Sequence, residues 1–137
     1  MIEIENAFRI KLNTISPVIA TAYENTPFDP KVLAVGTPYQ EVSFLPSYND
    51  NVFIDNGGYL SYGLVQILLK YPNSQGTKAI LDRVKLYLDN FKSGSNLTKD
   101  GIVINIQGTP SIKNLGVVGD RFVYAISINY MAHYEMV

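Results

Sequence analysis

Residues 59–91 constrain the fold of this chain more than any other segment. The stretch Tyr59–Tyr71 (YLSYGLVQILLKY) is apolar and rich in aromatic and branched side chains, and it alternates from Leu64 to Tyr71. A helix is the alternative, but Gly63 weakens it. These properties favour a β-strand that is buried largely on one side. Residues 72–76 (PNSQG) break the run, and Thr77–Phe91 then repeats apolar residues at helical spacing. The segment predicts a strand, a turn and an amphipathic helix, a unit suited to packing and assembly.

Flanking segments supply more elements of the same kind. Ile2–Ile15 has helical spacing, with acidic residues in its first turn, and Pro17 ends it. The pair Gly119-Asp120 indicates a tight turn. Alternating, β-prone residues predict strands at Val18–Glu24, Tyr39–Leu45, Ile102–Gln107, Ser111–Val118 and Arg121–Tyr134.

Two segments between these elements are polar and rich in turn residues. Pro46–Gly58 (PSYNDNVFIDNGG) predicts a long, mobile loop, and Lys92–Gly101 predicts a polar connector. A loop of this length in a small domain is usually functional or disordered.

The predicted order is α-β-β-β-α-β-β-β. This order favours an α+β fold with a mostly antiparallel β-sheet and two main helices packed on one face. At 137 residues, the chain is expected to form a single domain over residues 1–137.

Composition and charge exclude several classes of function. The net charge of −1 provides no basic footprint for nucleic acid. The absence of Cys excludes disulfides and thiolate metal sites. The N-terminus does not have the pattern of a signal peptide, and no window has the ~20 apolar residues needed to span a bilayer, so we expect no membrane association. Charged residues are only 17%, while Tyr and Phe number ten and six, which favours a surface made for a protein partner.

Residues that carry chemistry do not form a recognisable motif. His133, the only histidine, has no sequence neighbour that would orient its ring for acid–base work. Glu41, Asp50 and Asp55 do not match the spacing of a calcium loop. Gly57-Gly58 lacks the Lys-Ser/Thr of a phosphate loop. We therefore expect no catalytic, cofactor-binding or metal-binding residues, and no enzymatic activity.

The chain resembles the tail terminator and minor tail proteins of long-tailed bacteriophages over nearly its whole length. The resemblance rests on the order of the elements and on these segments: Ile2–Ile15 (IEIENAFRIKLNTI), Ala20–Phe28 (ATAYENTPF), Tyr39–Pro46 (YQEVSFLP), Gly63–Leu68 (GLVQIL), Tyr71–Gly76 (YPNSQG), a helix ending at Phe91, and Arg121–Ala132.

This resemblance implies a structural protein of the virion tail, assembled in the host cytoplasm. Members typically form a hexameric ring that caps the tail tube, ends its polymerisation and offers a surface to the head. The implied partners are further copies of the chain, the tail tube protein and a head completion or connector protein, with DNA passing through the lumen without specific binding. Alternatives are another head–tail joining or minor tail component and, from a different class, a small-molecule-binding module that uses the aromatic sheet.

The resemblance also implies that loops dock on neighbouring subunits. The turn-rich loop is the natural candidate, and we expect it to be mobile in the free subunit and ordered in the assembly. The candidate interface residues are Tyr48, Asn49, Asp50, Asn51, Val52, Phe53, Asp55 and Asn56.

Overall fold

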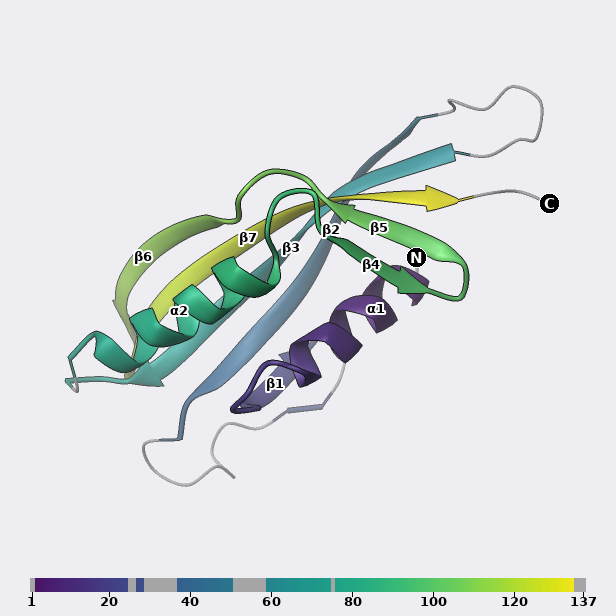
Figure 1. Cartoon of the computed structure of the whole chain (residues 1–137). Coiled ribbons are helices and arrows are strands. Elements are labelled where there is room, and N and C mark those ends of the chain that lie inside the picture. The colour runs from purple at the N-terminus through teal and green to yellow at the C-terminus, as the bar shows by residue number, and fades with distance from the viewer. Residues whose placement is uncertain (1, 25–26, 29–36, 51–58, 75, 135–137) are drawn as a thin grey trace.

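The computed structural model describes residues 2–24, 27–28, 37–50, 59–74 and 76–134, which form a curled sheet with two helices (Figure 1). The helices are α1 (Ile2–Asn13) and α2 (Lys78–Asn90). The strands are β1 (Ala20–Tyr23), β2 (Tyr39–Asp50), β3 (Tyr59–Pro72), β4 (Asn96–Lys99), β5 (Ile102–Ile106), β6 (Ser111–Val118) and β7 (Arg121–Tyr134).

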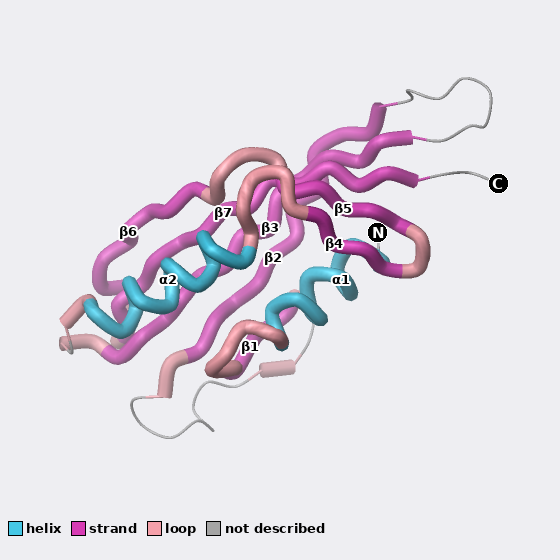
Figure 2. The backbone as a smooth tube through the Cα atoms, in the orientation of Figure 1, coloured by secondary structure: helices cyan, strands magenta, loops and turns pink. Residues whose placement is uncertain are grey.

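The sheet is built around the long antiparallel pair β3 and β7 (Figure 2). Its order is β1-β2-β3-β7-β5-β4, and β6 also pairs with β7. β7 therefore has two partners along one edge: β6 pairs with the segment 121–127 and β5 with the segment 130–133. β1 pairs with β2 in parallel, while the other pairs are antiparallel, so the sheet is mixed.

The core is a single cluster of side chains from both helices and from alternate positions of the strands. Phe8 of α1 lies fully buried among the rings of Phe44, Phe91 and Tyr130, with ring centroids 5.9–6.1 Å away. In β3 every second residue is buried, which is the pattern of a strand with one face on a core. The other buried members include Ile4, Leu12, Val42, Val65, Ile67, Leu69, Ile80, Val84, Tyr87, Ile104, Ile106, Ile126, Ile128 and Ala132.

The expected α+β fold is confirmed in part, because the structure is mostly β, with a curled mixed sheet and two helices. The polar connector predicted at 92–101 is wrong in part, because Asn96–Lys99 form β4. β4 pairs with β5, and the amide of Asn105 donates to the side-chain oxygen of Asn96 at 2.8 Å. The two turn residues are Asp100 and Gly101, both with positive φ. Asp-Gly is a strong hairpin signal, and it marks the strand that the polar composition concealed.

The loop predicted at Pro46–Gly58 is also wrong in part. β2 continues to Asp50, and its last residues pair with the start of β3. A register shift between Pro46 and Tyr48 accommodates the proline, which has no N–H to donate to a neighbouring strand. Residues 51–58 of the predicted loop lie outside the described residues.

A buried polar network joins α2 to the N-terminal segment. Arg83 is 3% exposed, and it donates to the hydroxyl of Tyr87 at 3.1 Å and to the carbonyl of Pro17. Tyr87 donates in turn to Gln40 of β2, whose amide donates to Thr21 of β1 at 2.8 Å. Buried polar groups need such partners, so this chain of hydrogen bonds holds β1 and β2 against α2.

We expect the folded protein to lose stability at alkaline pH because the hydroxyl of Tyr87 is buried. Burial raises the pKa of its hydroxyl to about 12 from the ordinary 10.0, while the charge of Arg83 opposes that rise. Because the folded pKa lies above the unfolded one, this stabilisation is complete below about pH 10 and is lost as the pH rises through about 12. Two units of pKa correspond to roughly 2.7 kcal/mol.

The matched variant is Tyr87→Phe, measured by urea unfolding across the same pH range. The unsubstituted chain should lose about 2.7 kcal/mol more than the variant between about pH 10 and 12. Stability curves that stay parallel over this range would contradict the assignment of the alkaline loss to Tyr87.

Candidate assembly surface

The sheet has a second face, formed by strand positions that alternate with the core positions. We call it the outer face. In β3, Leu64 and Gln66 are half-buried between fully buried neighbours. Cross-strand partners share a face, so register assigns the other members. The centre of the outer face consists of Leu45, Tyr48, Tyr62, Leu64, Gln66, Ser127, Asn129 and Met131, none of which is charged.

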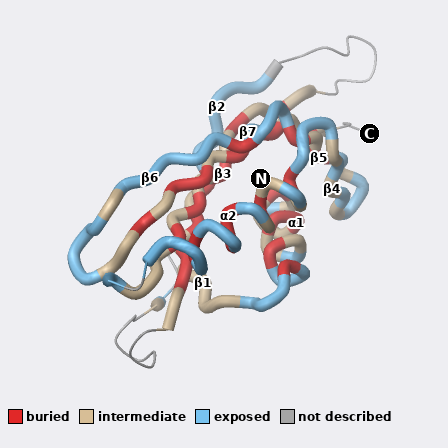
Figure 3. The backbone as a smooth tube through the Cα atoms, turned by 60° about the vertical axis from the view of Figure 1, so that its left-hand side comes forward, coloured by how far each residue is buried: buried red, intermediate tan, exposed pale blue. Residues whose placement is uncertain are grey.

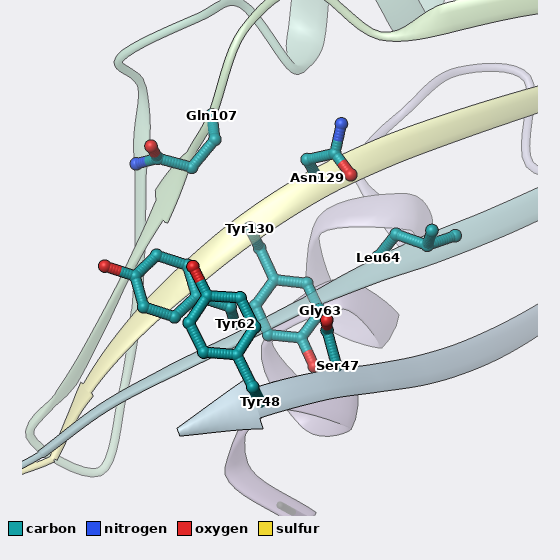
Figure 4. A pocket seen from close by; sticks show the side chains of 8 residues that line it. All are labelled: Ser47, Tyr48, Tyr62, Gly63, Leu64, Gln107, Asn129 and Tyr130. Atoms are coloured by element: carbon teal, nitrogen blue, oxygen red, sulfur yellow. The ribbon is translucent and has the colours of Figure 1, made fainter. Parts of the chain in front are cut away.

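A shallow cleft of about 340 Å³ opens on this face (Figure 4). Tyr48 and Tyr62 lie together beside it, stacked with ring centroids 4.5 Å apart. Gln107, in the segment between β5 and β6, and Asn129 of β7 provide amide groups. The remaining lining residues are Ser47, Gly63, Leu64 and Tyr130.

Gly63 leaves the space that the ring of Tyr130 occupies. A Cβ atom at position 63 would lie 2.5 Å from the Tyr130 hydroxyl and 2.9 Å from the carbonyl oxygen of Leu45. No ordinary side chain fits there. The glycine allows Tyr130 to cross beneath β3, so that this ring reaches the wall of the cleft as well as the core.

The ends of β2 and β7 and the start of β3 form a three-stranded arm that extends past the helices (Figure 1). Tyr48 stacks on Tyr62 on the outer face, and Tyr59 stacks on Tyr134 with centroids 5.0 Å apart. Positions 59 and 62 differ by an odd number, so the two pairs lie on opposite faces of the arm. Tyr134 is also partly buried, and this burial raises the pKa of its hydroxyl to about 12, with the charge of Glu3 adding to the rise. The arm thus carries aromatic rings on both faces.

Only Tyr48, Asn49 and Asp50 of the predicted interface residues are among those that the structure describes. Tyr48 lines the cleft, Asn49 pairs with Ser61, and Asp50 pairs with Leu60 at the end of β2. The predicted residues Asn51, Val52, Phe53, Asp55 and Asn56 lie outside the described residues. The prediction missed Tyr62, Leu64 and Asn129, which the alternation of β3 and β7 places on one face, and Gln107, which follows β5.

Glu41 and His133 stand at outer-face positions by register, but neither lines the cleft. Glu41 accepts a hydrogen bond from Lys70 at 2.9 Å, across β2 and β3. His133 is half-buried in β7, opposite Leu60 and Val103. In the described part of the chain, no three His, Cys, Asp or Glu side chains gather in a way that could hold a metal ion. Neither described helix is long and apolar enough to cross a membrane.

Comparison with solved structures identifies the same fold in another protein. One structure superposes with a TM-score of 0.73 at 18% sequence identity, and the match covers 94% of this chain and 92% of the other. At this identity the likeness concerns the fold alone. A comparison with curated protein sequences found no match.

Comparison with protein families identifies the family of this chain. The family described as phage tail terminator protein matches residues 3–130, which span both helices and every strand from β1 to β6, together with most of β7. The match confirms the resemblance seen in the sequence. The chain belongs to the phage tail terminator protein family.

Proposed function

We propose that this protein caps the tail tube of a phage or prophage as a ring, ends tube polymerisation and provides the surface that joins the tail to the head. The family match over residues 3–130 carries the proposal. Membership places the chain among structural components of the virion tail. We further propose that the ring is a hexamer, and that it contacts the tail tube protein on one side and a head completion protein on the other.

The chemistry of the surface supports an assembly role. The centre of the outer face combines aromatic and uncharged polar side chains, and Tyr48 exposes 58% of its surface there. Aromatic enrichment and depletion of charge are features of interface cores. The Tyr48–Tyr62 stack is an anchor of the kind that provides much of the binding energy in protein complexes.

The balance of charges supports a lumen through which DNA passes without specific binding. Specific and nonspecific DNA binding both depend on Lys and Arg contacts to phosphates. The net charge of the chain is −1, and several of its basic side chains are engaged within the subunit. Lys70 pairs with Glu41, Lys78 pairs with Asp82, and Arg83 is buried.

A second candidate function rests on the cleft. Its volume of about 340 Å³ lies near the lower end of the range for small-molecule sites, and it combines three aromatic rings with two amide side chains. A ligand-binding module would show a ligand-dependent rise in melting temperature with a stable monomer. A role as another head–tail joining component would instead show binding to the connector without arrest of the tube.

Elongation of tail tubes tests the proposed function. Purified protein should be added to tube protein of the same phage while the tubes are growing, and tube length should be followed over time. We expect growth to stop at the length reached when the protein is added, at amounts that match the number of tube ends. Growth that continues at the same rate with excess protein would contradict the capping role.

A further inference from the structure

Strand β6 is exposed along almost its whole length. Seven of its eight residues are exposed, as Figure 3 shows by the pale blue colour of this strand. Val117 and Val118 expose 54% and 52% of their surfaces, and Ile112 and Leu115 also project into solvent. Within the described residues, β6 pairs with β7 alone, so its second edge has no partner strand there.

Such an edge is normally protected. An unpaired strand with apolar side chains is a template for pairing with another chain, and proteins usually blunt it with charges, proline or brevity. β6 has eight residues, contains no proline and carries one charge, that of Lys113. A register shift between Asn114 and Gly116 divides it into two runs, and the first, Ser111–Asn114, pairs with β7 without interruption.

β1 lies at the other end of the same sheet. In the half of the sheet that contains β6, the order of strands is β6-β7-β3-β2-β1. β1 pairs in parallel with β2, and among the described residues its second edge has no partner strand either. Among the described residues, one subunit thus has different open edges at β6 and β1, at opposite ends of this half of the sheet, while β4 ends the other half. Two different edges are what a head-to-tail contact requires.

We propose that the β6 edge of one subunit pairs with the β1 edge of the next, so that the sheets of neighbouring copies join around the ring. The inference rests on the proposed ring and assigns the strands that close it. The occupant of the β6 edge is therefore a second copy of this chain.

Length, charge and side-chain direction fit this pairing. β1 has four residues, as many as the uninterrupted run Ser111–Asn114. β1 itself has no charge and is followed directly by exposed Glu24, whose sign is opposite to that of Lys113 and whose carboxylate also accepts a hydrogen bond from the backbone N–H of Phe44 within the subunit. Lys113 pairs with Ala125, and Ala22 pairs with Glu41, which places positions 113 and 22 on the outer face. In a continuous sheet these two positions would project from the same side.

Cysteine crosslinking tests the pairing cleanly because the native chain has no Cys. The test chain carries Ala22→Cys and Lys113→Cys, and each single variant serves as a control. A second double variant, Thr98→Cys with Lys113→Cys, places a thiol on β4 instead, the last strand at the other end of the described sheet. All are treated with a short bis-maleimide, both in concentrated solution and on tail tubes, after melting temperatures confirm that they fold.

We expect a ladder of covalent multimers only from the chain with cysteines at 22 and 113. Dimers from Lys113→Cys alone would show that β6 pairs with itself, and a ladder only from the variant at 98 and 113 would assign the contact to β4; both results overturn the inference. Absence of any ladder overturns it as well, including when electron microscopy shows rings. A ladder without arrest of tube growth would retain the edge pairing and refute the proposed function.

Discussion

Replacing Phe8 with alanine is expected to lower the free energy of unfolding by about 3–5 kcal/mol. Phe8 is fully buried and lies within 6.1 Å, between ring centroids, of Phe44, Phe91 and Tyr130. These rings belong to β2, the end of α2 and β7, so one side chain joins four parts of the fold. Its removal loses the transfer energy of the ring and leaves a cavity that rigid neighbours cannot fill.

Urea unfolding measures this effect, and Ile10→Ala on the same helix is the matched control. Ile10 exposes 53% of its surface, so its truncation should change stability by no more than about 0.5 kcal/mol. A loss for Phe8→Ala as small as that of the control would show that α1 does not pack on the sheet as described.

Replacing Gly63 with alanine is expected to cost about 3 kcal/mol, at the upper end of the range for overpacking. The added Cβ would lie 2.5 Å and 2.7 Å from two atoms of Tyr130 and 2.9 Å from the backbone oxygen of Leu45. The ring belongs to the packed core, and the carbonyl belongs to β2, which is held in the sheet by β3. Neither neighbour can move without disturbing another strand.

A double-mutant cycle isolates the cause. Tyr130→Phe removes the hydroxyl that makes the nearest contact, so the pair Gly63→Ala with Tyr130→Phe should be less destabilised than the sum of the two single variants. Strict additivity of the two changes would contradict the close approach of Tyr130 to position 63. Unfolding in urea is again the measurement.

Much of the fold could be predicted because local pattern and tertiary structure agree. Arg121–Tyr134 alternates cleanly, and the structure pairs it with three other strands. Gly119-Asp120 predicted a tight turn, and the structure closes β6 onto β7 there. In each case, the side chains that the pattern placed on one face have a core to enter.

The errors arise where a distant partner decides the local structure. Residues 46–50 are turn-rich, yet the start of β3 and the Tyr48–Tyr62 stack hold them in a strand. In α2, Leu81 belongs to the apolar residues that repeat at helical spacing but is 43% exposed, while Arg83 is buried. Arg83 donates to the carbonyl of Pro17, which is 66 positions away, and helical periodicity contains no information about that partner.

The candidate surface was harder to predict than the fold. Composition indicated a protein interface and the turn-rich segment indicated its position, but only Ser47 and Tyr48 from that segment line the cleft. The other lining residues come from β3, β7 and the segment after β5, and strand order alone brings them together. The exposed β6 edge could not be recognised either, because Ser111–Val118 reads like any other short strand until its neighbours are known.

Imaging of tail tube ends by electron microscopy tests the central claim most directly. Tubes are mixed with the purified protein, and their tips are compared with the tips of tubes kept without it. We expect a ring of added density at one end of each tube, with six-fold symmetry, and no further growth from that end. Tips without added density, on tubes that keep the length distribution of the untreated sample, would contradict it.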